Sequence, residues 1–323
     1  AEIGNNHEGN FEVAKHMIIE AAAAGVDAVK FQTFIPEQFI SSEDQSRINR
    51  LRSFQLSYLQ FKKLSKVAKK KGLIFFSTPL DIKSAKFLNT IQPIFKISSG
   101  DNNFYSLIDT VAGFGKSMIV STGATDIKSL KKVYNKVLKA WSSKKKRNLN
   151  FAFLHCVSSY PVPNDQVNLA SIKYLKKMFP NVVVGYSDHT IGIDAAVSSV
   201  VAGARIVEKH FTLDKKYSDF RDHQLSADPK EMTMLVNQIR KNEKMLGKEE
   251  KKPQSCEKEM KILGRRSIAV ARDLSARTKL SSFHLTWVRP ARGFLPGQEK
   301  KVLGKKLRKN LKLGDIVRKI DLK

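Results

Sequence analysis

Cysteine is scarce in this sequence of 323 residues, and long apolar runs are missing from it. With only Cys156 and Cys256, the chain cannot be a disulfide-stapled scaffold, and we expect a cytoplasmic, reducing location. No stretch approaches the roughly 20 consecutive apolar residues that cross a bilayer, because Asp27 interrupts the apolar run at 21–29. The sequence therefore predicts no membrane partner. The first residue is Ala1, inside a strand-like run, so we expect further residues before it.

Acidic residues are also few, since 30 Asp and Glu stand against 58 Lys and Arg, for a net charge of +28. Such an excess suits a protein that binds nucleic acid or an acidic glycan. However, the lysines are spread along the chain, aromatic residues are not interleaved with them, and the densest tracts, 69–71 and 144–147, fall at predicted helix ends or loops. We therefore favour a solvated basic surface that suits an anionic substrate, with no nucleic-acid partner.

Short β-branched and aromatic runs alternate with amphipathic segments through most of the chain. The eight strand-like runs lie at 1–4, 26–33, 73–79, 94–98, 118–122, 151–156, 182–187 and 205–211. Predicted helices include 11–24, 57–71, 127–141, 193–202 and 229–246, the last capped by Asp228. Eight parallel strands, each followed by a helix, form a (β/α)8 or TIM barrel of about 250 residues. The sequence thus predicts an α/β catalytic domain at 1–246.

The composition changes after this point. Residues 247–263 are dense in Lys and Glu and are predicted to be a linker. From 264 to 323, short strand-like runs at 267–271, 285–289 and 316–322 alternate with turn signals, which predicts a small β-rich domain. At about 60 residues it lies near the lower limit for independent folding, so we expect it to pack on the barrel or on a partner subunit.

Polar and ionisable residues recur where the predicted strands end. Active sites of (β/α)8 barrels lie at this end, so these side chains should converge at one mouth. Residues two apart on a strand share a face, as Lys30 and Gln32 do, and as Glu208 and His210 do. The other candidates at strand ends are Glu2, Thr78, Lys96, Ser99, Asp101, Ser121, Ser158, Tyr160, Ser187 and His189.

Two histidines follow neighbouring strands. His189 and His210 could share one divalent metal ion, with carboxylate and water completing the coordination. Equally, they could be unrelated histidines hydrogen-bonded at the barrel rim. The spacing leaves both interpretations open. Glu2, Asp101 and Asp222 are candidates for acid–base work or for binding sugar hydroxyls.

Two lysines point into the predicted mouth. Lys30 and Lys96 could form a Schiff base, as in a pyruvate aldolase, or clamp a phosphate or carboxylate. The surrounding hydroxyls favour a bound anion, whereas two adjacent ammonium groups would also lower each other's pKa and so favour the amine. From residue types alone the two hypotheses remain close.

Several of these motifs together resemble the sialic acid synthase family. The motifs are Glu2-Ile3-Gly4-Asn5-Asn6-His7-Glu8-Gly9, Val29-Lys30-Phe31-Gln32-Thr33, Phe76-Ser77-Thr78-Pro79, Lys96-Ile97-Ser98-Ser99-Gly100-Asp101, Ser121-Thr122-Gly123, His155-Cys156, Ser187-Asp188-His189-Thr190 and Glu208-Lys209-His210-Phe211-Thr212. The tail, with Trp287-Val288-Arg289-Pro290 and Leu303-Gly304-Lys305, resembles the family's antifreeze-protein-like (SAF, β-clip) domain. The resemblance covers nearly the whole chain, in the same order.

The resemblance implies a transferase of carbohydrate biosynthesis. It would condense phosphoenolpyruvate with an open-chain N-acyl hexosamine, either N-acetylmannosamine or a diacetamido-dideoxy analogue. The product would be a 2-keto-3-deoxy nonulosonic acid, released with phosphate. A divalent metal, Mn²⁺ or Mg²⁺, and a domain-swapped homodimer are also implied. Because phosphoenolpyruvate is already an activated enol, this reaction needs no Schiff base.

The resemblance also implies roles for single residues. His189 and His210 would bind the metal, and Glu2 and Asp101 would be catalytic. Phosphoenolpyruvate would contact Lys30, Thr78, Lys96, Ser99, Ser121, Ser158 and Ser187. The sugar would contact Gln32, Tyr160, Asp222 and, from the partner's tail, Arg289. The chain departs from the family pattern at Asp101, at Ser158 and in segment 215–222, which leaves neuraminic, legionaminic and pseudaminic types of product open.

Overall fold

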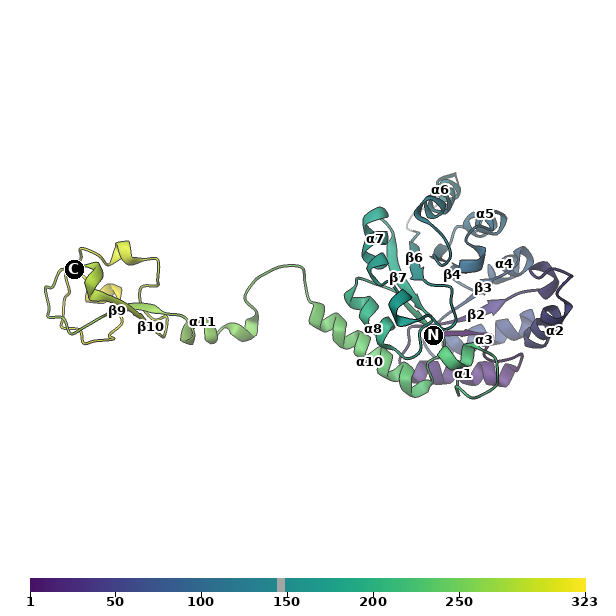
Figure 1. Cartoon of the computed structure of the whole chain (residues 1–323), viewed down its shortest axis with the longest axis horizontal. Coiled ribbons are helices and arrows are strands. Elements are labelled where there is room, and N and C mark those ends of the chain that lie inside the picture. The colour runs from purple at the N-terminus through teal and green to yellow at the C-terminus, as the bar shows by residue number, and fades with distance from the viewer. Residues whose placement is uncertain (144–148) are drawn as a thin grey trace. The chain divides into compact units, whose positions relative to one another are not determined.

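The computed structural model describes residues 1–143 and 149–323, so the basic tract at 144–147 lies outside the described residues. The chain divides into two compact units, Ala1–Gly247 and Lys248–Lys323, each drawn in Figure 1. None of the helices in the described part of the chain combines the length and apolar character that a membrane span needs.

The first unit contains eight parallel strands in chain order. They are β1 (Glu2–Gly4), β2 (Ala28–Thr33), β3 (Ile74–Pro79), β4 (Ile94–Ile97), β5 (Ser117–Ser121), β6 (Phe151–Cys156), β7 (Val183–Asp188) and β8 (Val207–Lys209). Ladders join β1–β2–β3 and β4–β5–β6–β7–β8, and a bridge between Glu2 and His210 connects the end of β8 to β1. The predicted α/β barrel is confirmed, although β8 is shorter than the run at 205–211.

The side chain of Gln92 connects β3 to the segment before β4. Within the described residues, no ladder of backbone hydrogen bonds joins these two neighbouring strands. The backbone N of Ser77 donates to Oε1 of Gln92 at 2.8 Å, and Nε2 of Gln92 donates back to the Ser77 carbonyl at 3.2 Å. Gln92 is buried, and its own carbonyl accepts from Nζ of Lys116 at 2.7 Å. The amide group thus satisfies backbone groups of β3 that a neighbouring strand would otherwise pair.

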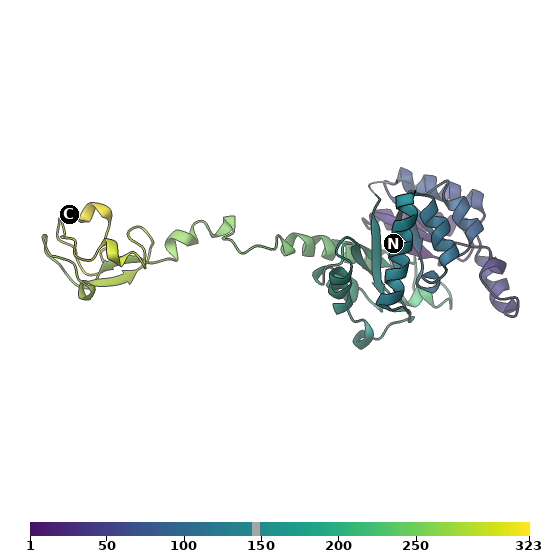
Figure 2. The same ribbon diagram turned by 90° about the horizontal axis from the view of Figure 1, so that it is seen from above.

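Helices surround the strands in both views of the molecule (Figures 1 and 2). Those that follow strands are α1 (Phe11–Ala23), α3 (Tyr58–Lys70), α4 (Ile82–Leu88), α5 (Tyr105–Gly113), α6 (Ile127–Ser143), α7 (Ala170–Met178), α8 (Asp194–Val201) and α10 (Pro229–Leu246). Asp228 caps α10 as predicted, because its carboxylate accepts from the backbone N of Glu231 at 2.8 Å. Two further helices, α2 (Gln45–Phe54) and α9 (Asp222–Leu225), lie in the long connections after β2 and β8.

The barrel interior has an apolar layer beneath a polar one. Phe76, Ile119, Ala152 and Leu154 form a buried cluster, against which Ala28, Ile94 and Ile206 pack. Most of these apolar residues lie two positions before a polar residue on the same strand, and residues two apart share a face. The polar partners are Lys30, Thr78, Lys96, Ser121 and Glu208. The apolar side chains therefore fill the barrel interior beneath the polar layer.

The second unit is built around a short antiparallel pair, β9 (Ser267–Val270) and β10 (Leu285–Val288). Its own core includes Ile268, Val302, Leu307 and Val317. The short helix α11 (Met260–Leu263), in the segment predicted as a linker, belongs to this unit, since the Ile262 carbonyl accepts from the backbone N of Ala291 at 2.9 Å.

One strand prediction in this unit is wrong. In place of a strand, the run at 316–322 contributes isolated bridges at Ile316 and Leu322, with a 3-10 turn, Lys319–Asp321, between them. The Asp321 carboxylate accepts from the backbone N of Arg318 at 2.9 Å and pairs with Lys309 at 3.0 Å. These local hydrogen bonds compete with extended pairing, as Asp side chains often do in turns.

Candidate active site

The polar layer opens into a cavity of about 390 Å³ at the carboxyl ends of the strands. Among its lining residues are twelve of those predicted from the sequence. They are Glu2, Lys30, Gln32, Thr78, Lys96, Ser99, Ser121, Ser158, Tyr160, Ser187, His189 and His210. Each of the eight strands contributes a lining residue, so the convergence expected from the barrel topology is present in the structure.

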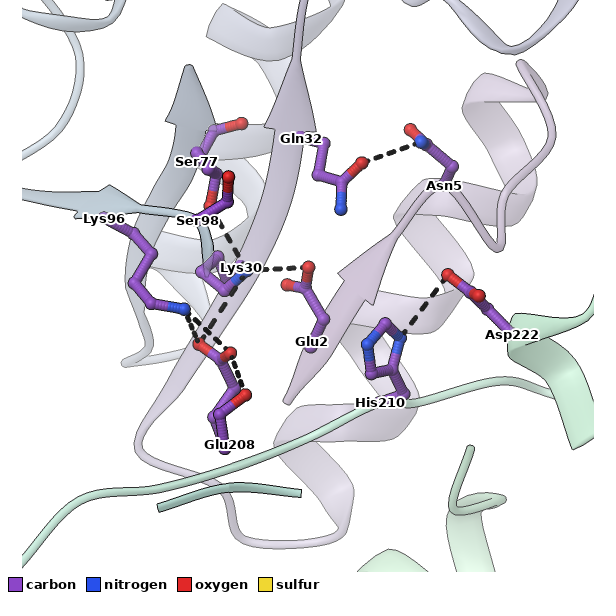
Figure 3. Close-up of polar contacts among 12 residues, drawn as sticks. Glu2, Asn5, Lys30, Gln32, Ser77, Lys96, Ser98, Glu208, His210 and Asp222 are labelled. Atoms are coloured by element: carbon purple, nitrogen blue, oxygen red, sulfur yellow. Dashed lines mark hydrogen bonds and ion pairs between the residues drawn. The ribbon is translucent and has the colours of Figure 1, made fainter. Parts of the chain in front are cut away.

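Two ammonium groups share one carboxylate among the residues that line this cavity (Figure 3). Nζ of Lys96 lies 2.9 and 3.1 Å from the two carboxylate oxygens of Glu208. Nζ of Lys30 lies 3.8 Å from Glu208 and 2.7 Å from Oε1 of Glu2, and donates to the Thr78 hydroxyl at 3.2 Å. The Ser187 hydroxyl also donates to Glu208, at 2.8 Å. All are buried or nearly so, which makes this an electrostatic network with little solvent screening.

Sequence reasoning gave Glu208 no role, although it lies at the centre of this network. The available signal was its position two residues before His210, on the inward face of β8. A carboxylate between two lysines keeps the cationic pair balanced within the protein. The same position lets an anionic ligand compete for the lysines.

The network shifts the pKa values of its members in different directions. Burial raises the pKa of Glu2 to about 7, because the opposing charge of Lys30 is not enough to offset desolvation. Burial also opposes ionisation of Glu208, but the charges of Lys30 and Lys96 outweigh it and lower the pKa of that carboxyl. Burial lowers the pKa of Lys96, whereas Glu2 and Glu208 overcome burial at Lys30 and raise its pKa. Glu2 is consequently the carboxyl poised to exchange a proton near neutral pH.

The cavity wall beside the lysines is formed by serine hydroxyls that pack against the backbone of Gly123. The Ser99 hydroxyl accepts from the backbone N of Gly123 at 3.1 Å. A Cβ at Gly123 would lie 2.2 Å from Oγ of Ser158 and 2.7 Å from Oγ of Ser99, so only glycine fits between them. Nδ2 of Asn102 holds the same turn by donating to the Gly123 carbonyl at 3.0 Å. Hydroxyl donors beside two ammonium groups suit a phosphate or carboxylate.

The two histidines face each other on the other side of the cavity, with ring centroids 5.4 Å apart. Nδ1 of His189 donates to the Val157 carbonyl at 2.9 Å, which leaves the Nε2 lone pair free. Nδ1 of His210 is buried and has no hydrogen-bond partner, and Oδ2 of Asp222 lies 3.8 Å away. Burial lowers the pKa of both imidazoles and so favours the neutral form that binds metals.

These residues fit a shared, open metal site. Within the described residues no group of three or more His, Cys, Asp or Glu side chains is arranged to hold an ion. The protein would therefore supply the two imidazoles, and water or substrate would fill the remaining positions. An open coordination position is typical of catalytic sites and not of structural ones.

A second cavity of about 610 Å³ adjoins the first. Gln32, Tyr160 and His210 line both, and Asn5 in the outer cavity donates from Nδ2 to Oε1 of Gln32 at 2.9 Å. Asp222, predicted to contact sugar, lines the outer cavity. Burial raises the pKa of its carboxyl, although Arg221 opposes this shift with Nε at 3.4 Å.

Two predicted residues differ from the others, because Asp101 is not a lining residue of these cavities and Arg289 belongs to the second unit. The Asp101 carboxylate nevertheless accepts from the hydroxyl of Ser98, which lines the inner cavity. Burial raises the pKa of Asp101. Arg289 follows β10 in the second unit and is exposed, and its role at the sugar remains a prediction.

Three arginines line the outer cavity that sequence reasoning did not identify. Arg47 and Arg50 lie on α2, and Arg221 precedes α9. None of them follows a strand directly, so the rule that located the other residues gave no signal for them.

A barrel whose mouth combines two lysines, a ring of hydroxyls and a neutral histidine pair defines an enzyme acting on small anionic substrates. The chain belongs to the NeuB family, whose model matches residues 17–251. The SAF domain model matches residues 265–323, so the predicted family resemblance is confirmed for both units.

Individual relatives span almost the whole chain. A protein of Methanocaldococcus jannaschii, described only as uncharacterized, is 42% identical over 98% of this chain and 92% of its own length. The N,N′-diacetyllegionaminic acid synthase of Campylobacter jejuni is 35% identical over 98% of both chains. Among solved structures, N-acetylneuraminic acid synthetase from Leptospira borgpetersenii is 35% identical with a TM-score of 0.74, covering 80% of this chain and 88% of that one.

Proposed function

We propose that this enzyme condenses phosphoenolpyruvate with an open-chain N-acyl hexosamine and releases phosphate and a 2-keto-3-deoxy nonulosonic acid. The observation that carries the proposal is the division of the inner cavity. One side presents Lys30, Lys96 and hydroxyls, which suit a doubly anionic substrate. The other presents His189 and His210, which suit a metal beside an aldehyde.

Phosphoenolpyruvate would bind in the basic half, against Lys30, Thr78, Lys96, Ser99, Ser121, Ser158 and Ser187. Its phosphate and carboxylate bring negative charge to lysines that already have carboxylate partners in Glu2 and Glu208. Protonation of Glu2, whose pKa is about 7, would reduce the repulsion. Burial from water then strengthens the remaining attraction between the ammonium groups and the ligand.

The sugar would bind with its aldehyde beside the histidines and its chain toward the outer cavity. Gln32, Tyr160 and Asp222 line that route and offer an amide, a phenol and a carboxylate to hydroxyl groups. His189 and His210 would hold Mn²⁺ or Mg²⁺, which supplies Lewis acidity to the aldehyde when bound. Arg289, reaching from the tail of the partner in a domain-swapped homodimer, would contact the N-acyl group.

The bonds then change in a balanced order. C3 of phosphoenolpyruvate attacks the aldehyde carbon to form the C–C bond, and the aldehyde oxygen takes a proton to become a hydroxyl. Water adds at C2 and loses one proton to a base, and the C–O bond to phosphate then breaks as the new C2 hydroxyl passes its proton to the departing phosphate and becomes a ketone. Oε2 of Glu2 is buried in the cavity without a partner, so Glu2 would accept or deliver these protons. Asp101 would take part through the Ser98 hydroxyl that it holds.

The product type follows from the sugar. N-acetylmannosamine would give a neuraminic acid, and a diacetamido-dideoxy hexose would give a legionaminic or pseudaminic acid.

Phosphate release tests this proposal. The protein is incubated with phosphoenolpyruvate, Mn²⁺ and a panel of N-acyl hexosamines, with and without EDTA. Release that depends on one sugar and stops with EDTA is expected. Phosphate release without any sugar, or none with every sugar from folded, metal-loaded protein, would contradict the proposal.

A Schiff-base aldolase is the competing function, since burial lowers the pKa of Lys96 and so favours its amine. Borohydride with pyruvate distinguishes the two. A trapped adduct that a Lys96→Met variant loses would favour the aldolase, and the synthase predicts no adduct.

A further inference from the structure

One face of α2 lines the outer cavity. Arg47, Arg50, Leu51 and Phe54 are spaced i, i+3, i+4 and i+7, so they share one side of the helix, and all four line the cavity. The ring of Phe54 packs edge-to-face on Phe220 at 5.2 Å, which ties this helix to the connection after β8. The helix therefore presents the side chains of Arg47 and Arg50 to the cavity.

These two guanidinium groups have no ion-pair partner within 4 Å among the described residues. Asp44 lies close in sequence, but its carboxylate caps α2 by accepting from the backbone N of Arg47 and from the Ser46 hydroxyl, both at 3.0 Å. The acidic residues of the outer cavity are Asp219 and Asp222. Asp222 is engaged by His210 and by Arg221.

Two other arginines in the same region, Arg221 and Arg52, have ion-pair partners. The guanidinium of Arg221 lies 4.7 Å from the centroid of the Tyr160 ring and its Nε contacts Asp222. Arg52 lies on α2 but does not line the cavity, and it pairs with Glu37 and donates to Asn49. Arg47 and Arg50 are exposed like these two, but they line the outer cavity and form no ion pair within the described residues.

The position of these arginines corresponds to the far end of the sugar. If the aldehyde lies beside His210, where the two cavities meet, the remaining carbons extend into the outer cavity toward α2. Both arginines are exposed, so water solvates them when a neutral hydroxyl lies at that end. A phosphate or carboxylate would accept hydrogen bonds from both guanidinium groups.

We propose that Arg47 and Arg50 form a binding subsite for an anionic group at the end of the sugar remote from the aldehyde. The substrate is accordingly an acidic N-acyl hexosamine, either a 6-phosphate or a hexuronic acid. This inference rests on the proposed function. Arg47 lines both cavities and would also influence phosphoenolpyruvate, whereas Arg50 lines only the outer one and separates the two effects.

The test compares Arg50→Gln with the matched control Arg52→Gln on the same helix. The probes are N-acetylmannosamine, its 6-phosphate and its uronic acid, at saturating phosphoenolpyruvate. We expect one acidic sugar to exceed the neutral one in kcat/KM, and Arg50→Gln to lose at least about tenfold with that sugar. The loss should be selective for the acidic sugar, and Arg52→Gln should behave as wild type. The better of the two acidic sugars identifies phosphate or carboxylate.

A wild-type enzyme that uses the neutral sugar as well as either acidic one would overturn this inference and leave the proposed reaction standing. An equal loss with all three sugars would also overturn it, because a general defect is not an anion subsite.

Calorimetric binding of both acidic sugars, without phosphoenolpyruvate, keeps the test independent of turnover. Arg50→Gln should weaken the tighter-binding one at least about tenfold, while unchanged binding of both would refute the subsite even if no sugar released phosphate.

Discussion

At the scale of single residues, four of the ten buried polar side-chain atoms that lack a hydrogen bond in the described part of the chain belong to residues lining the two cavities. Oε2 of Glu2, Oδ1 of Asn5, Nδ1 of His210 and Oδ1 of Asp222 are all buried and form no hydrogen bond within the described residues, although Nε of Arg221 lies 3.4 Å from the last. Leaving such atoms unpaired costs stability, so they are rarely retained without a reason. Each of these four residues lines a cavity, where a substrate, water or metal can satisfy it.

His7 is a different case, because it lines neither cavity. Its Nδ1 accepts from the backbone N of Gly9 at 3.0 Å, and its Nε2 is buried without a partner. Burial lowers the pKa of His7 from its usual 6.5 to about 4. The folded protein therefore binds this proton less readily than the unfolded chain does.

From this shift we predict an acid-sensitive contribution to stability. It is fully present above pH 6.5 and is lost as the pH falls through 6.5 toward 4, reaching about 3 kcal/mol in total. A His7→Asn variant, which keeps an acceptor for Gly9, should show a shallower fall in the free energy of unfolding over this range. Urea unfolding at several pH values measures the slope, with the exposed His16→Asn as control. Parallel curves for His7→Asn and wild type would refute the assignment.

At the scale of elements, a buried ion pair connects β7 to β8 behind the histidines. Nζ of Lys209 lies 2.9 Å from Oδ2 of Asp188, and both side chains are almost fully buried. Oδ1 of Asp188 accepts from the Tyr186 hydroxyl and from the backbone N and hydroxyl of Thr190. The pair and its hydrogen bonds therefore hold the ends of the two strands that carry His189 and His210.

Removing one partner of this pair should be costly. We predict that Lys209→Met lowers the free energy of unfolding by about 3–5 kcal/mol, because the Asp188 charge stays buried and uncompensated. Adding Asp188→Asn should recover part of the loss. The exposed pair of Lys136 and Asp109 offers a control, since Lys136→Met should cost less than about 1 kcal/mol. Chemical denaturation measures all of these, and a similar small loss for Lys209→Met and Lys136→Met would contradict the account.

The sequence predicts those parts of the structure that follow from regular alternation. Period-two patterns and strand ends locate the barrel and place residues such as Lys30, Lys96 and His189 on one cavity. They give no signal for Gln92, whose side chain bonds the backbone of β3 where β4 does not pair with it. That contact depends on how the two strands are placed in the fold. They also miss Arg47 and Arg50, since cavity residues on an inserted helix are defined only by how that helix packs.

At the scale of the whole molecule, the net charge of +28 becomes easier to interpret once the cavities are known. Most lysines are on the surface, where their field attracts anions over about a Debye length. Cations in the cavities instead meet the ligand directly. A basic surface therefore supplements a site for anionic substrates, and no feature of the described cavities requires a nucleic acid.

Assembly gives a prediction at this scale, because Arg289 belongs to the second unit. If the tail of one subunit completes the site of its partner, inactive chains should complement each other. Co-refolding His189→Ala with Arg289→Ala should restore about a quarter of wild-type activity at low sugar concentration, since half of the dimers are mixed and each of these contains one intact site. Chains that remain inactive when mixed would show that the tail acts within its own subunit or not at all.

The most direct test of the central claim follows one oxygen atom. Phosphoenolpyruvate labelled with ¹⁸O at the bridging position is supplied with Mn²⁺ and the preferred N-acyl hexosamine, and the products are analysed by mass spectrometry. Condensation with C–O cleavage predicts that the label leaves in inorganic phosphate, and only when sugar is present. Label retained in the keto acid, or phosphate formed without sugar, would contradict the account.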